Sequence, residues 1–173
     1  MGFIVTISIG VLSSICASVI FVFFLTRLRP KIKISDFVVI ETMPDSSKKY
    51  WLKFVNYGRR DIIDARFELL LSTPRNAADG ISTHRKTIML IKDSMMFIPA
   101  YDKHDPFKSY AKRISTSEPL DTLWNDEHTY LTLRIIGKDA VSGFSKFFVK
   151  DMYSKNSTLR EKKHKTGLSL DVE

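Results

Sequence analysis

The chain has 173 residues, with 27 Lys and Arg against 19 Asp and Glu, a formal net charge of +8 and one cysteine. The single cysteine excludes a disulfide framework, and seven unclustered glycines leave no glycine-rich phosphate-binding loop. The four histidines lack the spacing of a metal site. We therefore expect no catalytic site, no metal and no cofactor.

The first predicted element is an apolar helix over residues 3–25, which contain no charged residue, Asn or Gln. At about 1.5 Å per residue it spans roughly 34 Å, enough to cross a hydrocarbon core of about 30 Å. A cleaved signal peptide would need a cationic segment before a shorter apolar run. No charge precedes this run, so we predict a retained transmembrane helix.

Residues 27–33 carry four cations, Arg27, Arg29, Lys31 and Lys33, whereas the N-terminal flank carries none. The positive-inside bias then predicts a single-pass protein of the cell (inner) membrane, with its N-terminus outside and residues 27–173 in the cytoplasm. These four cations are our candidate lipid- or anion-binding residues, with anionic phospholipid as the partner. The alternative is that they only set orientation and solubility.

Small residues follow one face of the predicted helix. Gly10, Ser14, Ala17 and Ser18 recur at spacings of three and four, which lets transmembrane helices approach closely and associate. Ordinary membrane-helix composition is the alternative reading.

The rest of the chain predicts strands. Residues 31–35, 37–41, 50–57, 62–72, 87–91, 95–101, 130–136 and 143–153 are short apolar or alternating runs. The clearest alternation places Ile63, Ala65, Phe67, Leu69 and Leu71 inward. Residues 74–80 read as a loop and 120–124 as a short helix.

These elements predict an all-β fold, an antiparallel β-sandwich preceded by one transmembrane helix. We divide the chain into a transmembrane helix (1–28), a cytoplasmic sandwich (29–153) and a basic polar tail (154–173), mobile or forming a short surface helix. The exposed cation pairs Lys48–Lys49, Arg59–Arg60 and Arg85–Lys86 are typical of solvated turns.

A further set of motifs runs through residues 29–153 in a fixed order. Arg29, Pro30 and Lys31 directly follow the apolar helix. The later positions are Val39–Ile40, Lys53 with Asn56, Ile62 with Ala65 and Leu71, and Glu118–Pro119–Leu120. In this order and spacing the chain resembles the cytoplasmic domain of inward-rectifier potassium channels.

The resemblance implies an immunoglobulin-like sandwich that assembles as a tetramer below the membrane. It also implies acidic-phospholipid contact by Arg29 and Lys31. The next position, usually basic in that family, is Ile32 here, and Lys33 is the substitute. This sequence has no pore helix and no Thr-x-Gly-Tyr-Gly filter, so we do not expect a potassium-selective channel.

We therefore expect a membrane-anchored, self-associating, non-enzymatic sensor or interaction module. A partner membrane protein fits this reading, and nucleic acid fits it poorly. The alternative is an effector that disrupts the membrane when a cytoplasmic nucleotide-type signal binds.

Overall fold

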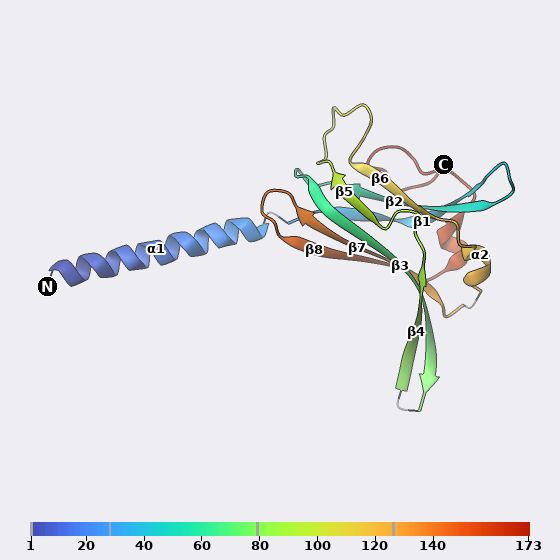
Figure 1. Ribbon diagram of the computed structural model, residues 1–173, viewed down its shortest axis with the longest axis horizontal. Coiled ribbons are helices and arrows are strands. Elements are labelled where there is room, and N and C mark those ends of the chain that lie inside the picture. Colours follow the sequence, from blue (N-terminus) through green and yellow to red (C-terminus); the bar gives the residue numbers. More distant parts are fainter. Residues whose placement is uncertain (1, 28, 79, 126) are drawn as a thin grey trace.

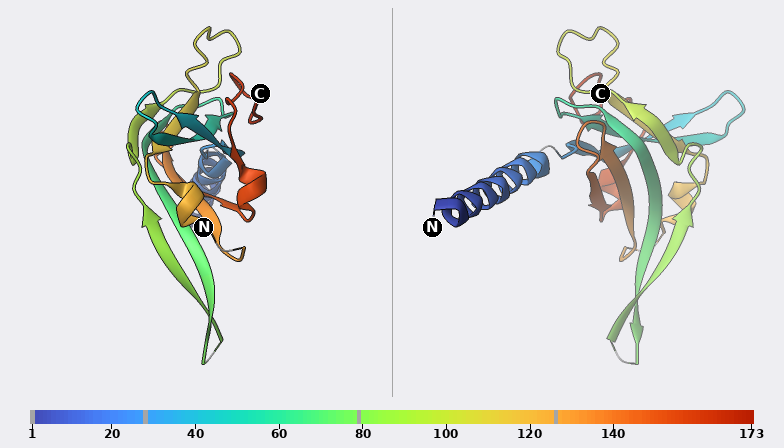
Figure 2. Two further views of the ribbon diagram at one scale, coloured as in Figure 1. Left: turned by 90° about the vertical axis from the view of Figure 1, so that its right-hand side faces the viewer. Right: turned by 60° about the vertical axis from the view of Figure 1, so that its left-hand side comes forward.

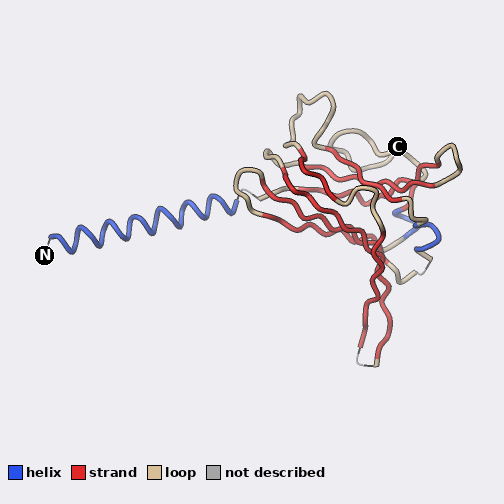
Figure 3. Tube along the Cα trace, viewed as in Figure 1, coloured by secondary structure: helices blue, strands red, loops and turns tan. Residues whose placement is uncertain are grey.

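The computed structural model describes all residues except 1, 28, 79 and 126. One long helix, α1 (Gly2–Arg27), projects from a body made mostly of strands (Figures 1 and 3). Over Val5–Phe24 the helix is long and apolar enough to cross a membrane, and this span is not buried against the body. The predicted long apolar helix is confirmed.

The body contains two sheets, which we call sheet A and sheet B. Sheet A has the strand order β6-β2-β1-β9, and sheet B has the order β4-β3-β7-β8, with β5 also paired to β3. All pairs are antiparallel except β1 with β9. The bounds are β1 (Ile32–Thr42), β2 (Lys48–Asn56), β3 (Ile62–Ala77), β4 (Gly80–Ile88), β5 (Ser94–Ile98), β6 (Ala111–Thr116), α2 (Leu120–Leu123), β7 (Tyr130–Asp139), β8 (Ser145–Met152), α3 (Lys155–Thr158) and β9 (Leu159–Arg160).

One hydrophobic core joins the two sheets. Tyr50, Leu52 and Phe54 enter it from sheet A, and Phe67 and Leu133 enter it from sheet B. The rings of Phe54 and Phe67 lie 5.0 Å apart between centroids. The prediction of a mostly β body built from antiparallel sheets is confirmed, whereas its immunoglobulin-like character stays a prediction.

The predicted alternation in β3 is correct from Ala65 to Leu71 and wrong at Ile63. Ile62 is fully buried instead, and Ile63 is half-buried. The pairing of β3 with β7 shifts register between Ile63 and Arg66, and Asp64 has a φ of 50°. Such a bulge inserts one extra residue, so the inward positions are even before it, at Ile62, and odd after it, from Ala65 onward.

Residues 74–77 and 80, part of the stretch 74–80 expected as a loop, belong to a long hairpin instead, and residue 79 lies outside the described residues. β3 continues to Ala77 and pairs with β4 from Leu69↔Ile88 to Ala77↔Gly80. The hairpin projects away from the body in every view (Figure 2). Pro74 is compatible with this strand because it lies beyond the packed core, where one missing ladder hydrogen bond leaves an exposed group.

For residues 154–173 the alternative of a short helix is correct over α3 (Lys155–Thr158), but the remainder is not a mobile tail, because it packs against sheet A. β9 pairs in parallel with β1 through Val38↔Leu159 and Val39↔Arg160. Further along, the Ser35 hydroxyl donates a hydrogen bond to the Leu170 carbonyl oxygen over 2.6 Å. We call residues 159–173 the C-terminal segment.

One end of the body must lie close to α1. Five Cα–Cα steps join Arg27 to Ile32, and they span at most about 18 Å when extended. In sheet A, β2 ends beside the start of β1. In sheet B, β5 and β7 end where β3 and β8 begin, so these strand termini share one end of the sheet. We call this end, which adjoins α1 in Figure 1, the helix-proximal end.

Candidate functional site

A pocket lined by four cations lies at the helix-proximal end. It has a volume of about 630 Å³ and is formed by residues 29–31, before β1, and residues 57–60, between β2 and β3. Arg29, Lys31, Arg59 and Arg60 supply the charge, and no carboxylate is among the described residues that line it. We call it the basic pocket.

Buried Asn56 shapes the turn that carries Arg59 and Arg60. Its amide nitrogen donates to the carbonyl oxygens of Arg60 (2.8 Å) and Pro99 (2.9 Å). Its amide oxygen accepts a hydrogen bond from the Gly58 N–H at 3.0 Å. A Cβ at position 58 would lie 3.1 Å from that oxygen, so glycine fits the close approach. The hydrogen bonds of the buried Asn56 side chain therefore fix the turn that carries Arg59 and Arg60.

The two halves of the basic pocket are joined by backbone. The Tyr57 N–H donates to the Lys31 carbonyl oxygen over 3.1 Å, which holds the turn after β2 beside the segment before β1. Arg29, Lys31 and Arg59 are exposed. Such a group of cations can donate several charge-assisted hydrogen bonds to one phosphate or carboxylate group.

Arg60 differs from its three neighbours. Its side chain is about one-third exposed, and Nη1 lies 3.8 Å from Asp139 Oδ1. That nitrogen is buried and has no hydrogen-bond partner among the described residues. Arg60 therefore connects the basic pocket electrostatically to the end of β7.

The predicted lipid-binding residues separate into three groups. Arg29 and Lys31 line the basic pocket. Lys33 lies outside its lining, with Nζ 5.1 Å from the centroid of the Tyr57 ring. Arg27 ends α1, and its side chain lies outside the described part of the structure.

Sequence reasoning missed Arg59 and Arg60 as members of this site. It treated them as a solvated pair at a turn. The available signal was the antiparallel pairing of β1 with β2, because Ile32↔Asn56 brings the turn after β2 back to the start of β1. Two cation pairs far apart in sequence thereby meet.

The predicted helix-association residues lie on one exposed side of α1. A Cβ at Gly10 would meet nothing within 4 Å, and the Ser18 hydroxyl donates to the Ser14 carbonyl oxygen over 2.9 Å. Gly10, Ser14, Ala17 and Ser18 therefore leave room for a second helix to approach α1 closely. Association of helices through this surface stays a prediction.

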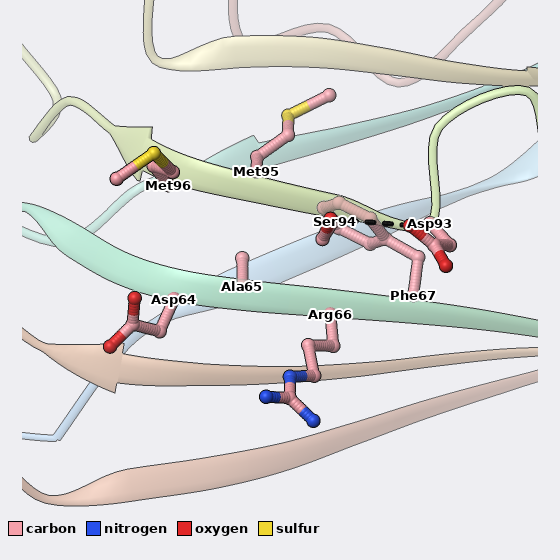
Figure 4. A pocket seen from close by; sticks show the side chains of 8 residues that line it. All are labelled: Asp64, Ala65, Arg66, Phe67, Asp93, Ser94, Met95 and Met96. Atoms are coloured by element: carbon pink, nitrogen blue, oxygen red, sulfur yellow. Dashed lines mark hydrogen bonds between the residues drawn. The ribbon is translucent and has the colours of Figure 1, made fainter.

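A second hollow lies over β3 and β5 (Figure 4). The Phe67 N–H donates to the Asp93 carbonyl oxygen over 2.7 Å, and the Ser94 hydroxyl donates to the Asp93 carboxylate over 3.2 Å. In Figure 4 the Asp64 and Arg66 side chains extend away from Met95 rather than toward a common point. A ligand site requires polar groups that converge on one point, and the polar groups of this hollow do not.

A third hollow, of about 680 Å³, separates the outer face of sheet A from the C-terminal segment. We call it the C-terminal groove. The Trp51 indole N–H donates to the Glu41 carboxylate over 2.6 Å, and Lys49 Nζ lies 4.4 Å from the Trp51 ring centroid. Arg113, Lys162 and Lys163 supply cations to the lining, and Glu41 and Glu161 supply anions.

Buried polar side chains hold the C-terminal segment beside this groove. Lys53, which alternation alone would place outward in solvent, is 2% exposed. Its Nζ donates to the carbonyl oxygens of Lys165 (2.5 Å) and Ser169 (2.6 Å). Burial, together with the nearby charge of Arg113, lowers the pKa of Lys53 to about 8.

His164 lies within the same contact. It is 3% exposed, and Nε2 is 3.1 Å from the Trp51 carbonyl oxygen. Burial lowers its pKa to about 4, so the imidazole is neutral at pH 7 and Nε2–H donates this bond. Arg113 donates to the His164 carbonyl oxygen over 3.1 Å.

Comparison with protein-family models gives no match, and comparison with curated proteins gives none either. Among solved structures, the chain is similar to the crystal structure of Spo0M, a sporulation control protein from Bacillus subtilis. The identity is 12%, the TM-score is 0.37, and the match covers 72% of this chain and 48% of that one. The chain thus spans about half the length of Spo0M, and a likeness this weak carries no argument about function.

Proposed function

We propose that this chain is a single-pass membrane protein whose body is a non-enzymatic sensor or interaction module, and that the basic pocket binds acidic phospholipid. One observation carries the proposal. Four cations from two separate segments gather at the end of the body that a short connection ties to an apolar helix. Each cation near an anionic leaflet contributes about 1 kcal/mol to binding, and the effect decays within a Debye length.

The orientation follows from the same charges. With the cations on the cytoplasmic side, the N-terminus lies outside and the body lies below the inner leaflet. The resemblance to the cytoplasmic domain of inward-rectifier channels supports this arrangement at Arg29 and Lys31, and it extends the proposal to a tetramer. Arg59 and Arg60 enter the proposal on their position alone.

The test titrates the full chain, solubilised in a neutral detergent, with short-chain phosphatidylserine or short-chain phosphatidylcholine. A ligand that binds the folded state raises the thermal midpoint of unfolding in a concentration-dependent way. We expect phosphatidylserine to raise the midpoint and phosphatidylcholine to leave it unchanged. Added salt should weaken the effect, because the cations are exposed.

Two variants remove the same amount of charge at different places. The first variant, Arg29→Ala with Lys31→Ala, removes two of the four cations that line the basic pocket. The second, Arg85→Ala with Lys86→Ala, removes two exposed cations from the β3–β4 hairpin. The first variant should lose most of the phosphatidylserine response and the second should keep it. Equal responses in the two variants would mean that net charge alone attracts the lipid.

A second candidate function rests on the C-terminal groove. The half-buried Trp51 ring beside several cations suits a small anionic aromatic ligand, and the body is then a nucleotide-triggered effector that disrupts the membrane. Adding AMP or GMP to the full chain in dye-loaded liposomes should then release dye and quench Trp51 fluorescence. Unchanged fluorescence at millimolar nucleotide, with Trp51→Phe as the reference, would remove this candidate.

A further inference from the structure

The β7–β8 turn presents apolar side chains beside the basic pocket. Val141 is 72% exposed and Phe144 is 38% exposed, although both lie in a turn where polar residues are usual. Their neighbours along the hairpin are cations, Lys138 and Lys146. Exposed apolar side chains flanked by lysines are typical of segments that lie in the membrane–water interface.

The turn is rigidly built around one buried carboxylate. Asp139 is fully buried, and its Oδ1 accepts hydrogen bonds from the N–H groups of Val141 (3.0 Å) and Ser142 (2.7 Å). The Asp139 N–H donates to the Phe144 carbonyl oxygen over 2.9 Å, which closes the turn. Gly143 has a φ of 72°, a conformation that glycine adopts without strain. The backbone that carries the two apolar side chains is therefore fixed before any partner binds.

The turn and the basic pocket also form one connected structure. The Ala140 N–H donates to the Asp61 carbonyl oxygen over 3.1 Å. Arg60, which lines the pocket, lies 3.8 Å from Asp139, which organises the turn. A partner that contacts the cations of the basic pocket is thus also close to Val141 and Phe144.

The short connection to α1 favours a membrane over a second copy of the chain as the partner of the β7–β8 turn. Because the start of β1 lies within about 18 Å of the end of α1, the helix-proximal end cannot move far from a bilayer that α1 spans. In Figure 1 the β7–β8 turn is the part of the body beside the end of α1. Cations surround the apolar side chains, which matches an anionic leaflet better than the equally cationic end of a second copy.

We propose that the β7–β8 turn is a second membrane contact, in which Val141 and Phe144 insert into the interfacial region of the leaflet whose headgroups the basic pocket binds. This inference rests on the proposed function and deepens it. The body then meets the membrane through a fixed apolar wedge and a cationic pocket together, which sets its orientation on the membrane.

The single cysteine makes a clean test possible. Cys16→Ser removes it, and Val141→Cys then places one thiol for an environment-sensitive fluorophore in the full chain. Ile81→Cys is the matched control, because Ile81 is equally exposed (77%) but lies near the tip of the β3–β4 hairpin. Both proteins are labelled in detergent and assembled into nanodiscs that contain phosphatidylserine, with or without a lipid carrying a shallow nitroxide quencher.

We expect the label at position 141 to shift to shorter wavelength and to lose most of its fluorescence with the nitroxide lipid, while the label at position 81 does neither. Equal, unquenched signals at both positions would overturn the wedge. A wavelength shift without quenching, dependent on the number of chains per disc, would assign the turn to a second copy and also overturn it. The short-chain phosphatidylserine titration on the same preparations reads the basic pocket separately, so loss of the wedge and loss of the pocket are distinguishable.

Phe144→Ser gives an independent check that needs no label at the turn. In nanodiscs the backbone amides of residues 140–144 should exchange hydrogen more slowly than in detergent, and this protection should be lost in the variant. The phosphatidylserine response of the basic pocket, which Phe144 does not line, should remain. Identical exchange in nanodiscs and detergent for the unsubstituted chain would contradict membrane contact.

Discussion

Lys53 and His164 couple the C-terminal segment to sheet A through polar atoms rather than through apolar packing. Lys53 donates to two carbonyl oxygens of the segment, and His164 donates back to the Trp51 carbonyl oxygen of β2. Each is nearly inaccessible to solvent. Because a buried polar group that loses its partner has a large desolvation cost, these two side chains should control whether the segment stays docked.

Acidification should undock the segment through His164. Its pKa is about 4 when folded, against 6.5 ordinarily, so between these values only the unfolded chain takes up the proton. The free energy of unfolding should therefore fall as the pH drops from about 6.5 to about 4, by on the order of 3 kcal/mol, with no further His164 contribution below pH 4. Denaturant unfolding at a series of pH values measures the slope.

Carboxylates titrate in the same range, so the informative quantity is the difference between variants. His164→Asn should flatten the slope, whereas the exposed His84→Asn should leave it unchanged. A slope that is the same in all three proteins would show that His164 is accessible to protons in the folded state.

Replacing Lys53 should release the same segment at neutral pH. Lys53→Met keeps the aliphatic packing but leaves the Lys165 and Ser169 carbonyl oxygens without their donor, at a cost of about 1–3 kcal/mol. Hydrogen exchange should accelerate across residues 163–171. The exposed Lys92→Met is the control, and equally fast exchange in both variants would contradict the contact.

At the scale of elements, β3 organises sheet B because it pairs with β4, β5 and β7. Its bulge at Asp64 turns Ile62 into the core, where it meets β7 closely. A Cβ built on Gly137 would lie 2.7 Å from Ile62 Cγ2, closer than real Cβ contacts. The β3–β7 pair therefore depends on a glycine that has an ordinary strand φ.

Gly137→Ala should thus destabilise the body by about 1–3 kcal/mol, because the methyl group forces Ile62 or the strand to shift. Thermal unfolding followed by circular dichroism measures the loss. Gly2→Ala adds the same methyl group where nothing lies within 4 Å and should have no effect on the body. An unchanged midpoint for Gly137→Ala would mean that the strands are further apart than described.

The predictable elements are those in which periodicity and burial agree. The alternation from Ala65 to Leu71 indicated a strand that packs on one face, and the apolar run before Arg27 indicated the long helix. The bulge at Asp64 left no signal, because an inserted residue preserves local alternation on each side. The C-terminal segment was misread because polar atoms dock it, and such contacts follow no hydrophobic pattern. The basic pocket was half predicted, since Arg59 and Arg60 join it only through strand pairing.

At the scale of the whole molecule, α1 is not buried against the body over Val5–Phe24, which leaves its surface available for the predicted self-association. The surface over Gly10, Ser14, Ala17 and Ser18 is free of large side chains on one side of α1. Close helix packing in lipid favours such surfaces. That the chain forms a tetramer stays a prediction, which only the sequence resemblance to inward-rectifier channels implies.

Gly10→Ile should reduce self-association, because a branched side chain blocks close approach of a second helix on this surface. Light scattering of the full chain in detergent should give a tetramer mass for the unsubstituted chain and a smaller mass for the variant. Leu12→Ile, on the opposite side of α1, is the control. A monomer at micromolar concentration for the unsubstituted chain would contradict the prediction outright.

The pairing of β1 with β9 also constrains the order in which the protein is made. β1 follows α1, yet its neighbour at Leu159 is synthesised about 120 residues later. At roughly 5–20 residues per second, β1 waits on the order of ten seconds with an open edge while α1 is already available to the membrane. Nascent chains that lie side by side can exchange this strand during that interval, so translation speed and chain crowding should affect the yield of correctly closed molecules.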